Sequence, residues 1–369
     1  MSMRFVHESL PQRVCFGSGL AAETVAAEVE RLGASKVMVI ASGSGSGSGL
    51  ADRVTAGVPV ALRHHEVVMH VPVEVAERAR EAAAVHGVDA LVSVGGGSAT
   101  GLAKAVALTS GLPVVAVPTT YAGSEATSIW GLTEGARKTT GTDPRVLPRV
   151  IVYDAELTVS LPAAMSVASG LNALAHCVDA MWGPNADPID RALAGEGIRA
   201  LRAGLLQVAA DPAGLDGREQ ALYAAYLSAV ALASAGAGLH HKICHVLGGA
   251  YNLPHAQTHA VVLPYVLAFN GPAMPEAERR IAAALGAERA DDGLAELRRE
   301  LAAPRTLRDY GFAEADIPAA AEAILPAVPP GNPRPVTAGD LRRLLSAAWQ
   351  GADPGVLAAT GDMSTEEDG

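Results

Sequence analysis

The chain has 369 residues, of which 49% are hydrophobic and 18% are charged, and its formal net charge is −11. A chain of this length and apolar content can bury a large core and is long enough for two domains. Because its 28 lysines and arginines are scattered among 39 acidic residues, we expect no basic patch and no nucleic-acid partner.

The N-terminal residues lack the apolar segment of a signal peptide, and no run of about 18 apolar residues follows them. We therefore expect neither export nor a membrane partner. The three cysteines, Cys15, Cys177 and Cys244, form no CxxC pair. This sparse set argues against disulfides and favours a reducing, cytoplasmic location.

Residues 14–155 alternate short apolar runs with amphipathic segments. The apolar runs predict buried parallel strands, and the amphipathic segments predict helices between them. The strands are expected at 37–40, 90–94 and 114–117, and the helices at 21–32, 74–86 and 99–110. This order is typical of α/β proteins, so we predict a Rossmann-like dinucleotide-binding domain over residues 1–158.

After residue 158 strand-like runs almost vanish, and segments rich in alanine, leucine and arginine predict helices instead. These helices are expected at 163–182, 189–210, 216–235, 275–286, 291–303, 317–324 and 339–349. We predict an all-α catalytic domain over residues 159–369, with a ligand cleft between the two domains.

A serine and glycine repeat, residues 42–49, follows the first predicted strand. Such a tract either cradles a phosphate or forms a mobile loop, and a loop is expected because no helix is predicted behind it. Dinucleotide sites often carry an acidic residue at this strand end, but this chain has Ala41 and Ser42. Since no carboxylate would repel a 2′-phosphate, we expect NADPH to be accepted alongside NADH.

Residues 95–98, Gly-Gly-Gly-Ser, join a predicted strand to a predicted helix. Glycines here let backbone N–H groups approach a pyrophosphate at the positive end of the helix dipole, although a tight turn alone would also use them. The next strand ends in a second polar loop, residues 118–125, at the same sheet edge. The residues expected to bind the cofactor are Ser42, Gly95, Gly96, Gly97, Ser98, Lys104, Thr119, Thr120 and Ser124.

Five of the eleven histidines fall between residues 240 and 259. Residues four apart on a helix share a face, so Asn172 pairs with His176, and His241 pairs with His245. His255 follows a proline and is expected in a turn. This clustering indicates a functional site. The histidines expected at the surface or in the core are His7, His64, His65, His70, His86 and His240, and His259 is left open.

The glycine loop with Lys104, the loop at 118–125 and the histidine segment 238–255 together resemble the iron-containing alcohol dehydrogenase family. Within that family, seven segments resemble the maleylacetate reductases: 8–14, 68–74, 97–101, 119–125, 169–176, 240–242 and 332–337. The resemblance implies a Rossmann-like α/β domain followed by an all-α domain, a fold similar to that of dehydroquinate synthase. It also implies a homodimer.

Metal-dependent members of the family would bind their ion through positions that match Asn172, His176, His241 and His255, with an aspartate at the first. His245 matches a histidine near the nicotinamide. The amide of Asn172 is a poorer ligand for a hard divalent ion than a carboxylate. A second departure is Gly101, at a position where many relatives carry aspartate. It also points to the maleylacetate reductase branch of the family. We expect a metal-free site, although the three imidazoles of His176, His241 and His255 could still hold zinc.

The resemblance implies NAD(P)H-dependent reduction of the conjugated C=C bond of maleylacetate to 3-oxoadipate in aromatic-compound degradation. We expect His245 and His255 to act as acid and oxyanion partner. His241 and His176 would clamp the substrate while Asn172 donates a hydrogen bond, and these roles are exchangeable. A dianionic keto acid also needs cations. The candidate cations are Lys242 and Lys138.

Four other functions stay open at this level. The protein could be an iron- or zinc-dependent alcohol dehydrogenase, or a reductase of another unsaturated keto acid in a different pathway. A synthase or lyase on the same scaffold would need a metal and more cationic residues. A binding protein without catalysis would keep only the fold.

Overall fold

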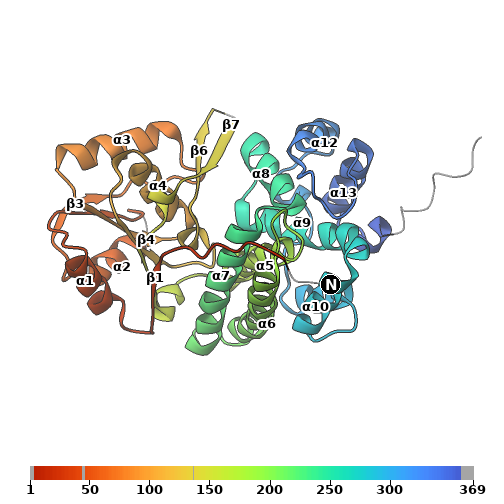
Figure 1. Ribbon diagram of the computed structural model, residues 1–369, viewed down its shortest axis with the longest axis horizontal. Helices are drawn as coiled ribbons and strands as arrows, with labels where there is room; N and C mark the ends of the chain where they lie inside the picture. The colour runs from red at the N-terminus through yellow and green to blue at the C-terminus, as the bar shows by residue number, and fades with distance from the viewer. Residues whose placement is uncertain (1–3, 44–45, 136, 359–369) are drawn as a thin grey trace, which may run out of the picture.

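The computed structural model describes residues 4–43, 46–135 and 137–358. Two halves lie side by side (Figure 1): an α/β half drawn in red to yellow and a helical half drawn in green to blue. This arrangement confirms the predicted fold class. The α/β half ends with strand β8 at Tyr153, and the first long helix of the other half begins at Ala163. The boundary at residue 158 stays a prediction within that interval.

A six-stranded parallel sheet forms the centre of the α/β half, in the order β1-β8-β5-β4-β2-β3. Runs of valine and isoleucine form its central strands because both sheet faces are buried. The strands are β1 (Arg13–Phe16), β2 (Val37–Ile40), β3 (Val60–His64), β4 (Ala90–Gly95), β5 (Val114–Pro118) and β8 (Val150–Tyr153). The predicted strands at 37–40, 90–94 and 114–117 are confirmed as β2, β4 and β5.

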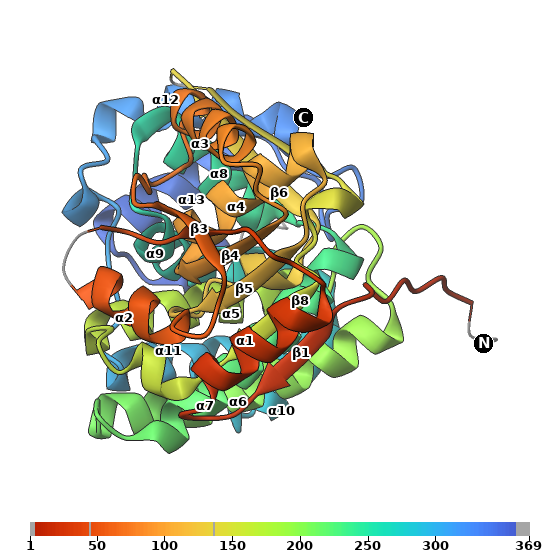
Figure 2. The same ribbon diagram turned by 90° about the vertical axis from the view of Figure 1, so that its left-hand side faces the viewer.

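Helices cover both faces of the sheet, as Figure 2 shows from the side of the α/β half. They are α1 (Ala21–Arg31), α2 (Ser46–Val54), α3 (Val73–Val85) and α4 (Gly97–Ser110). Side chains alternate along β2, so Val37 and Val39 pack with α1 and α2, whereas Met38 and Ile40 pack with α3 and α4. Each face of the sheet therefore has its own apolar core.

Two local features differ from the sequence prediction. The repeat at 42–49 does not end as a loop, because α2 begins within it at Ser46. Residues 44 and 45 lie outside the described residues. Strands β6 (Ile129–Glu134) and β7 (Arg137–Thr142) form an unpredicted antiparallel hairpin that projects beside helix α8 of the other half (Figure 1).

The helical half contains α5 (Ala163–Ala180), α6 (Pro188–Ala210), α7 (Leu215–Ala235), α8 (Leu239–Tyr251), α9 (His255–Asn270), α10 (Pro275–Leu285), α11 (Ala290–Glu300), α12 (Ile317–Ile324) and α13 (Ala338–Gln350). All seven predicted helices are confirmed within three residues at each end. Short 3-10 helices occur at Ser124–Ala126, Pro144–Val146, Ala155–Thr158, Gly271–Ala273, Arg308–Tyr310, Glu314–Asp316, Leu325–Ala327 and Pro354–Leu357.

Small residues let the helices of this half pack closely. Where α6 crosses α7, a Cβ atom on Gly204 would lie 2.7 Å from the carbonyl oxygen of Gly217. A Cβ atom on Gly170 of α5 would lie 2.5 Å from Leu205 of α6. These contacts explain the abundance of glycine and alanine, and they set the position of α5 in the core.

No single helix among the described residues is long and apolar enough to cross a membrane. Helices α7 and α8 meet the length and composition of a span only when taken together, and they are bent by 101° relative to each other.

Candidate active site

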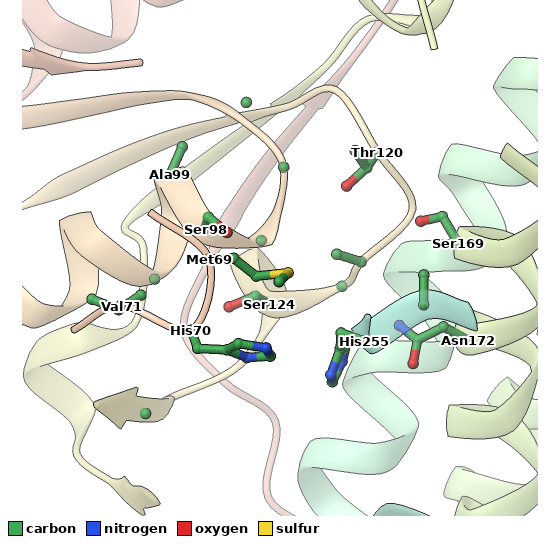
Figure 3. A pocket seen from close by; sticks show the side chains of 18 of the residues that line it. Met69, His70, Val71, Ser98, Ala99, Thr120, Ser124, Ser169, Asn172 and His255 are labelled. Carbon is green, nitrogen blue, oxygen red and sulfur yellow. The ribbon is translucent and has the colours of Figure 1, made fainter. Parts of the chain in front are cut away.

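A cavity of about 800 Å³ lies between the two halves. One wall consists of loops at the carboxyl ends of β2, β4 and β5, and the other consists of α5, α8 and the start of α9. Figure 3 shows side chains from both walls turned toward this space. A cavity of this size can hold a nucleotide end together with a small substrate.

The first wall, here called the loop wall, is built around the turn from β4 into α4. Gly95 has φ +150°, a conformation that side-chain-bearing residues rarely adopt. A Cβ atom on Gly96 would lie 3.0 Å from Cγ2 of Thr120, so the two loops touch at this point. Gly96 also has no side chain to cap α4. The first N–H groups of this 14-residue helix can therefore bind an anion.

Eight of the nine residues predicted to bind the cofactor line the cavity. They are Ser42, Gly95, Gly96, Gly97, Ser98, Thr119, Thr120 and Ser124. The sheet order brings them together because β2, β4 and β5 are neighbours that end at one edge.

Lys104 is the exception, and its predicted contact with the cofactor is corrected here. The residue is fully buried, does not line the cavity, and its Nζ donates to the carbonyl oxygens of Ser124 (2.5 Å), Thr127 (2.7 Å) and Ile129 (2.8 Å). Burial lowers the pKa of Lys104 to about 7, and the charge of Glu125 opposes this shift. Lys104 thus holds the second loop in place from behind.

The second wall, here called the histidine wall, contains Asn172, His176, His241, His245 and His255. The first two lie on α5 and the next two on α8, in the predicted pairs four residues apart. His255 is the first residue of α9 rather than part of a turn, because Pro254 is the N-cap of that helix. The ring centroids of His176 and His241 are 5.0 Å apart, and those of His241 and His245 are 6.0 Å apart.

Asp179 is a member of this site that sequence reasoning missed. Its Oδ2 atom accepts hydrogen bonds from Nδ1 of His241 (2.7 Å), the backbone N–H of His241 (3.2 Å) and that of Gly238 (3.0 Å). Burial acts to raise the pKa of Asp179, but the hydrogen bond and charge of His241 outweigh it and lower the pKa. Asp179 follows His176 by three residues on α5, so its helical spacing was the available signal.

The Asp179 contact determines the tautomer of His241. With Nδ1 donating to the carboxylate, Nε2 of His241 carries the lone pair, and it has no hydrogen-bond partner among the described residues. Nδ1 of His176 and Oδ1 of Asn172 are likewise buried without a hydrogen-bond partner in the described chain. Burial lowers the pKa of His176 well below its usual value. The wall therefore offers polar atoms to a ligand.

Two further histidines lie behind this wall. Nε2 of His240 and Nδ1 of His259 share a hydrogen bond of 3.0 Å, and the His259 ring lies 4.3 Å from that of His255 between centroids. Burial lowers the pKa of His240 to about 3 and that of His259 well below its usual range. Both rings are therefore neutral near pH 7, and they support the cavity histidines from the core.

The two lysines expected to bind the anionic substrate lie outside the described cavity lining. Lys242 is half-buried and is not among the residues that line the cavity, so its role as an anchor for an anionic substrate stays a prediction. The side chain of Lys138 lies outside the described residues. Among the described residues that line the cavity, none is lysine or arginine.

The cavity donors differ at one position from the metal ligands that the resemblance implies. In the part of the chain that the structure describes, two groups of three have ligand atoms within 4.8 Å of one another: His240 with Cys244 and His259, and His7 with Asp187 and Asp190. The trio of His176, His241 and His255 is not such a group. The fourth donor is a neutral amide, which is a weak ligand for a hard cation.

Both halves of the chain match models of the same protein family. A model of the iron-containing alcohol dehydrogenases matches residues 11–155, and a model of the C-terminal part of the Fe-containing alcohol dehydrogenase family matches residues 166–349. The chain is 45% identical over 352 residues to the maleylacetate reductase of Sphingobium indicum, covering 95% of this chain and 99% of that protein.

Solved structures agree with this comparison. An iron-containing alcohol dehydrogenase from Corynebacterium glutamicum is 60% identical with a TM-score of 0.94, covering 97% of this chain and 100% of that one. The maleylacetate reductase of Rhizobium sp. strain MTP-10005 is 44% identical with a TM-score of 0.88, covering 96% of this chain and 100% of that one.

Proposed function

The chain belongs to the iron-containing alcohol dehydrogenase family and is an oxidoreductase, and we propose that it reduces the conjugated C=C bond of maleylacetate with NADH or NADPH. The product is 3-oxoadipate, formed during the degradation of aromatic compounds. The observation that carries this proposal is the histidine wall, in which Asn172 stands beside His176 and His241 instead of a carboxylate. The identity to maleylacetate reductases over 95% of the chain supports it.

The loop wall binds the dinucleotide in this proposal. The N-terminus of α4 binds the pyrophosphate, while Thr120 and Ser124 line the cavity from the adjoining loop. The end of β2 carries Ala41 and Ser42, so no carboxylate from these two positions repels a 2′-phosphate. This arrangement supports the use of both NADPH and NADH.

The histidine wall stabilises the charge that forms during reduction. A bound reduced nicotinamide supplies the hydride, which adds to the alkene carbon β to the ketone. The electron pair of the C=C bond then moves toward the ketone oxygen, giving an enolate, and a proton added at the α carbon restores the ketone. Polar groups placed in advance around this oxygen lower the barrier because they need no reorganisation.

His241 is one candidate proton donor of the wall, and Asp179 holds its ring in place. Asp179 accepts the hydrogen bond from the Nδ1–H of His241 and so orients the ring, which leaves Nε2 as the ring nitrogen available to the substrate. His176 is neutral and serves as a hydrogen-bonding partner, as does the amide of Asn172. His245 and His255 remain candidates for the oxyanion contact and for proton delivery.

We propose that this reaction proceeds without a metal. Conjugation lets the ketone of an unsaturated keto acid accept charge with hydrogen-bond donors alone, whereas reduction of a simple carbonyl depends more on a Lewis acid. The neutral amide of Asn172, at the position where the metal-dependent relatives would carry a carboxylate, supports this assignment.

The test measures the oxidation of NADH and of NADPH with maleylacetate, before and after treatment with a chelator, together with the metal content of the protein. Turnover that is unchanged by the chelator is expected. Activity that disappears with a tightly held iron or zinc would establish the metal-dependent alternative. Absence of turnover with either nucleotide would refute the proposed substrate.

We also propose a cytoplasmic homodimer that acts on a small anionic keto acid and has no nucleic-acid or membrane partner. The family resemblance supports the dimer, and the three free cysteines are compatible with a reducing compartment. Light scattering after size exclusion would measure the oligomeric state directly.

A further inference from the structure

The segment that leads into α3 has an unusual backbone. His70 has φ 64° and Val71 has φ 49°, both in the left-handed region. Val71 is β-branched and precedes Pro72, and each of these properties disfavours such a conformation. Two consecutive residues in this state persist only where the surroundings hold them.

The surroundings of this segment are specific. The Oγ1 atom of Thr133 donates to the carbonyl oxygen of His70 (2.9 Å), and the N–H of Thr133 donates to that of Val71 (3.1 Å). The Val71 side chain is buried against α4, where a Cβ atom on Gly101 would lie 3.0 Å from its Cγ2 atom. Gly101 thus leaves the room that Val71 occupies, and the β6-β7 hairpin fastens the backbone.

This geometry directs the His70 ring into the cavity. Figure 3 shows the ring extending from the loop wall toward the side on which His255 lies. Its Cε1 atom comes within 3.7 Å of the position of a Cβ atom on Gly248, three residues after His245 on α8. The ring therefore reaches from the α/β half to the surface of the helical half.

The position matters for the charge of the substrate. Maleylacetate carries two carboxylates, and no lysine or arginine is among the described residues that line the cavity. Among those same residues, His70 is the one titratable side chain that the α/β half contributes. An imidazole N–H donates well to a carboxylate oxygen.

We infer that His70 binds one of the two carboxylates of the substrate, opposite the histidines that act on its ketone. The inference rests on the proposed function. The two halves of the protein then hold different parts of one substrate, and the site distinguishes dicarboxylates from monocarboxylates. The strained segment serves to place this imidazole.

The test is the variant His70→Ala. Some contacts stabilise the bound substrate and the transition state by the same free energy. Removing such a contact raises KM and leaves kcat unchanged. We expect KM for maleylacetate to rise by about tenfold or more and kcat to change by less than about threefold. Competitive inhibition by the dicarboxylate adipate should weaken by a similar factor, whereas inhibition by the monocarboxylate hexanoate should not change.

Two further variants separate binding from folding. His65→Ala changes an exposed histidine of the same segment that does not line the cavity, and it should behave as the wild type. Thr133→Val keeps the shape but removes the hydrogen bond to His70, so KM should rise by a smaller factor at unchanged NADPH affinity. If His70→Ala leaves KM and the preference for adipate over hexanoate unchanged, the inference is wrong.

The outcome stays separable from that of the proposed function. If the wild type does not reduce maleylacetate, calorimetric titration of adipate and hexanoate into the protein with NADP⁺ still tests the role of His70. Preference for adipate that is lost in His70→Ala would then support the carboxylate contact alone. Equal binding of both acids by the wild type would overturn it.

Discussion

The two walls of the cavity use different parts of the chain for their chemistry. Much of the loop wall is glycine, serine and threonine, and in the proposed function the backbone around Gly96 binds the nucleotide phosphate. The histidine wall is lined by imidazole and amide side chains: burial lowers the pKa of His176, and Asp179 orients His241 through a hydrogen bond. The difference teaches that a nucleotide phosphate needs a main-chain shape, whereas an enolate needs titratable groups. Substitutions in the histidine wall should therefore lower kcat, whereas substitutions in the loop wall should weaken nucleotide binding.

The largest effect is expected on the histidine wall. His241→Gln and Asp179→Asn should each lower kcat by about 10²- to 10⁴-fold, because the donor loses either its proton or the carboxylate that orients it. NADPH affinity should stay unchanged, as measured by fluorescence titration. His86→Ala, a change at the exposed C-cap of α3, is the control. Parallel losses in kcat and nucleotide affinity would show that the walls are not separable.

Lys104→Met probes the support of the loop wall. The change leaves the carbonyl groups of Ser124, Thr127 and Ile129 without their donor, so the free energy of unfolding should fall by about 1–3 kcal/mol. Urea denaturation measures this loss. An unchanged free energy of unfolding would show that the ammonium group contributes nothing net.

The same variant has a distinct pH dependence. Burial lowers the pKa of Lys104 to about 7 from an ordinary value of 10.5. Between these values the unfolded chain holds a proton that the folded protein has released, so the free energy of unfolding of the wild type rises with pH, by at most about 1.4 kcal/mol per unit. Lys104→Met should lack this contribution when denaturation is compared at pH 7 and pH 9.

A matched pair of glycine changes tests the backbone of the loop wall. A Cβ atom on Gly96 would lie 3.0 Å from Thr120, whereas one on Gly97 would lie 3.5 Å from Ala122, an ordinary contact. Gly96→Ala should therefore weaken NADPH binding by about tenfold, or roughly 1.4 kcal/mol, and Gly97→Ala by less. Both should retain kcat at saturating nucleotide. Wild-type affinity in Gly96→Ala would contradict the backbone mechanism.

The smallest effect concerns acid stability of the histidine wall. Burial lowers the pKa of His240 to about 3 from an ordinary value of 6.5. Between these values only the unfolded chain binds the proton, so acidification from pH 6.5 lowers the free energy of unfolding. His240→Leu should reduce this pH slope by at most about 1.4 kcal/mol per unit. An identical slope in the variant would show that other groups dominate acid unfolding.

Sequence reasoning identified most members of the site but not their partners. The spacing of Asn172 with His176 and of His241 with His245 placed four side chains correctly on one cavity. Asp179 was missed although it follows His176 by three residues on α5, because that spacing alone does not reveal its contact with His241 on α8. Lys104 was misassigned because its motif could not reveal that three carbonyl groups surround it.

The sequence by itself determined the two-part fold, the glycine loop and the histidine pairs, since hydrophobic period, glycine placement and helical spacing are local properties. Only the tertiary structure decided which residues face the cavity, which histidines are buried and neutral, and which carboxylate orients His241. It also placed the strained His70 segment at the site. Burial and long-range hydrogen bonds depend on contacts between residues far apart in the chain, and those contacts exist only after the helices and strands have packed.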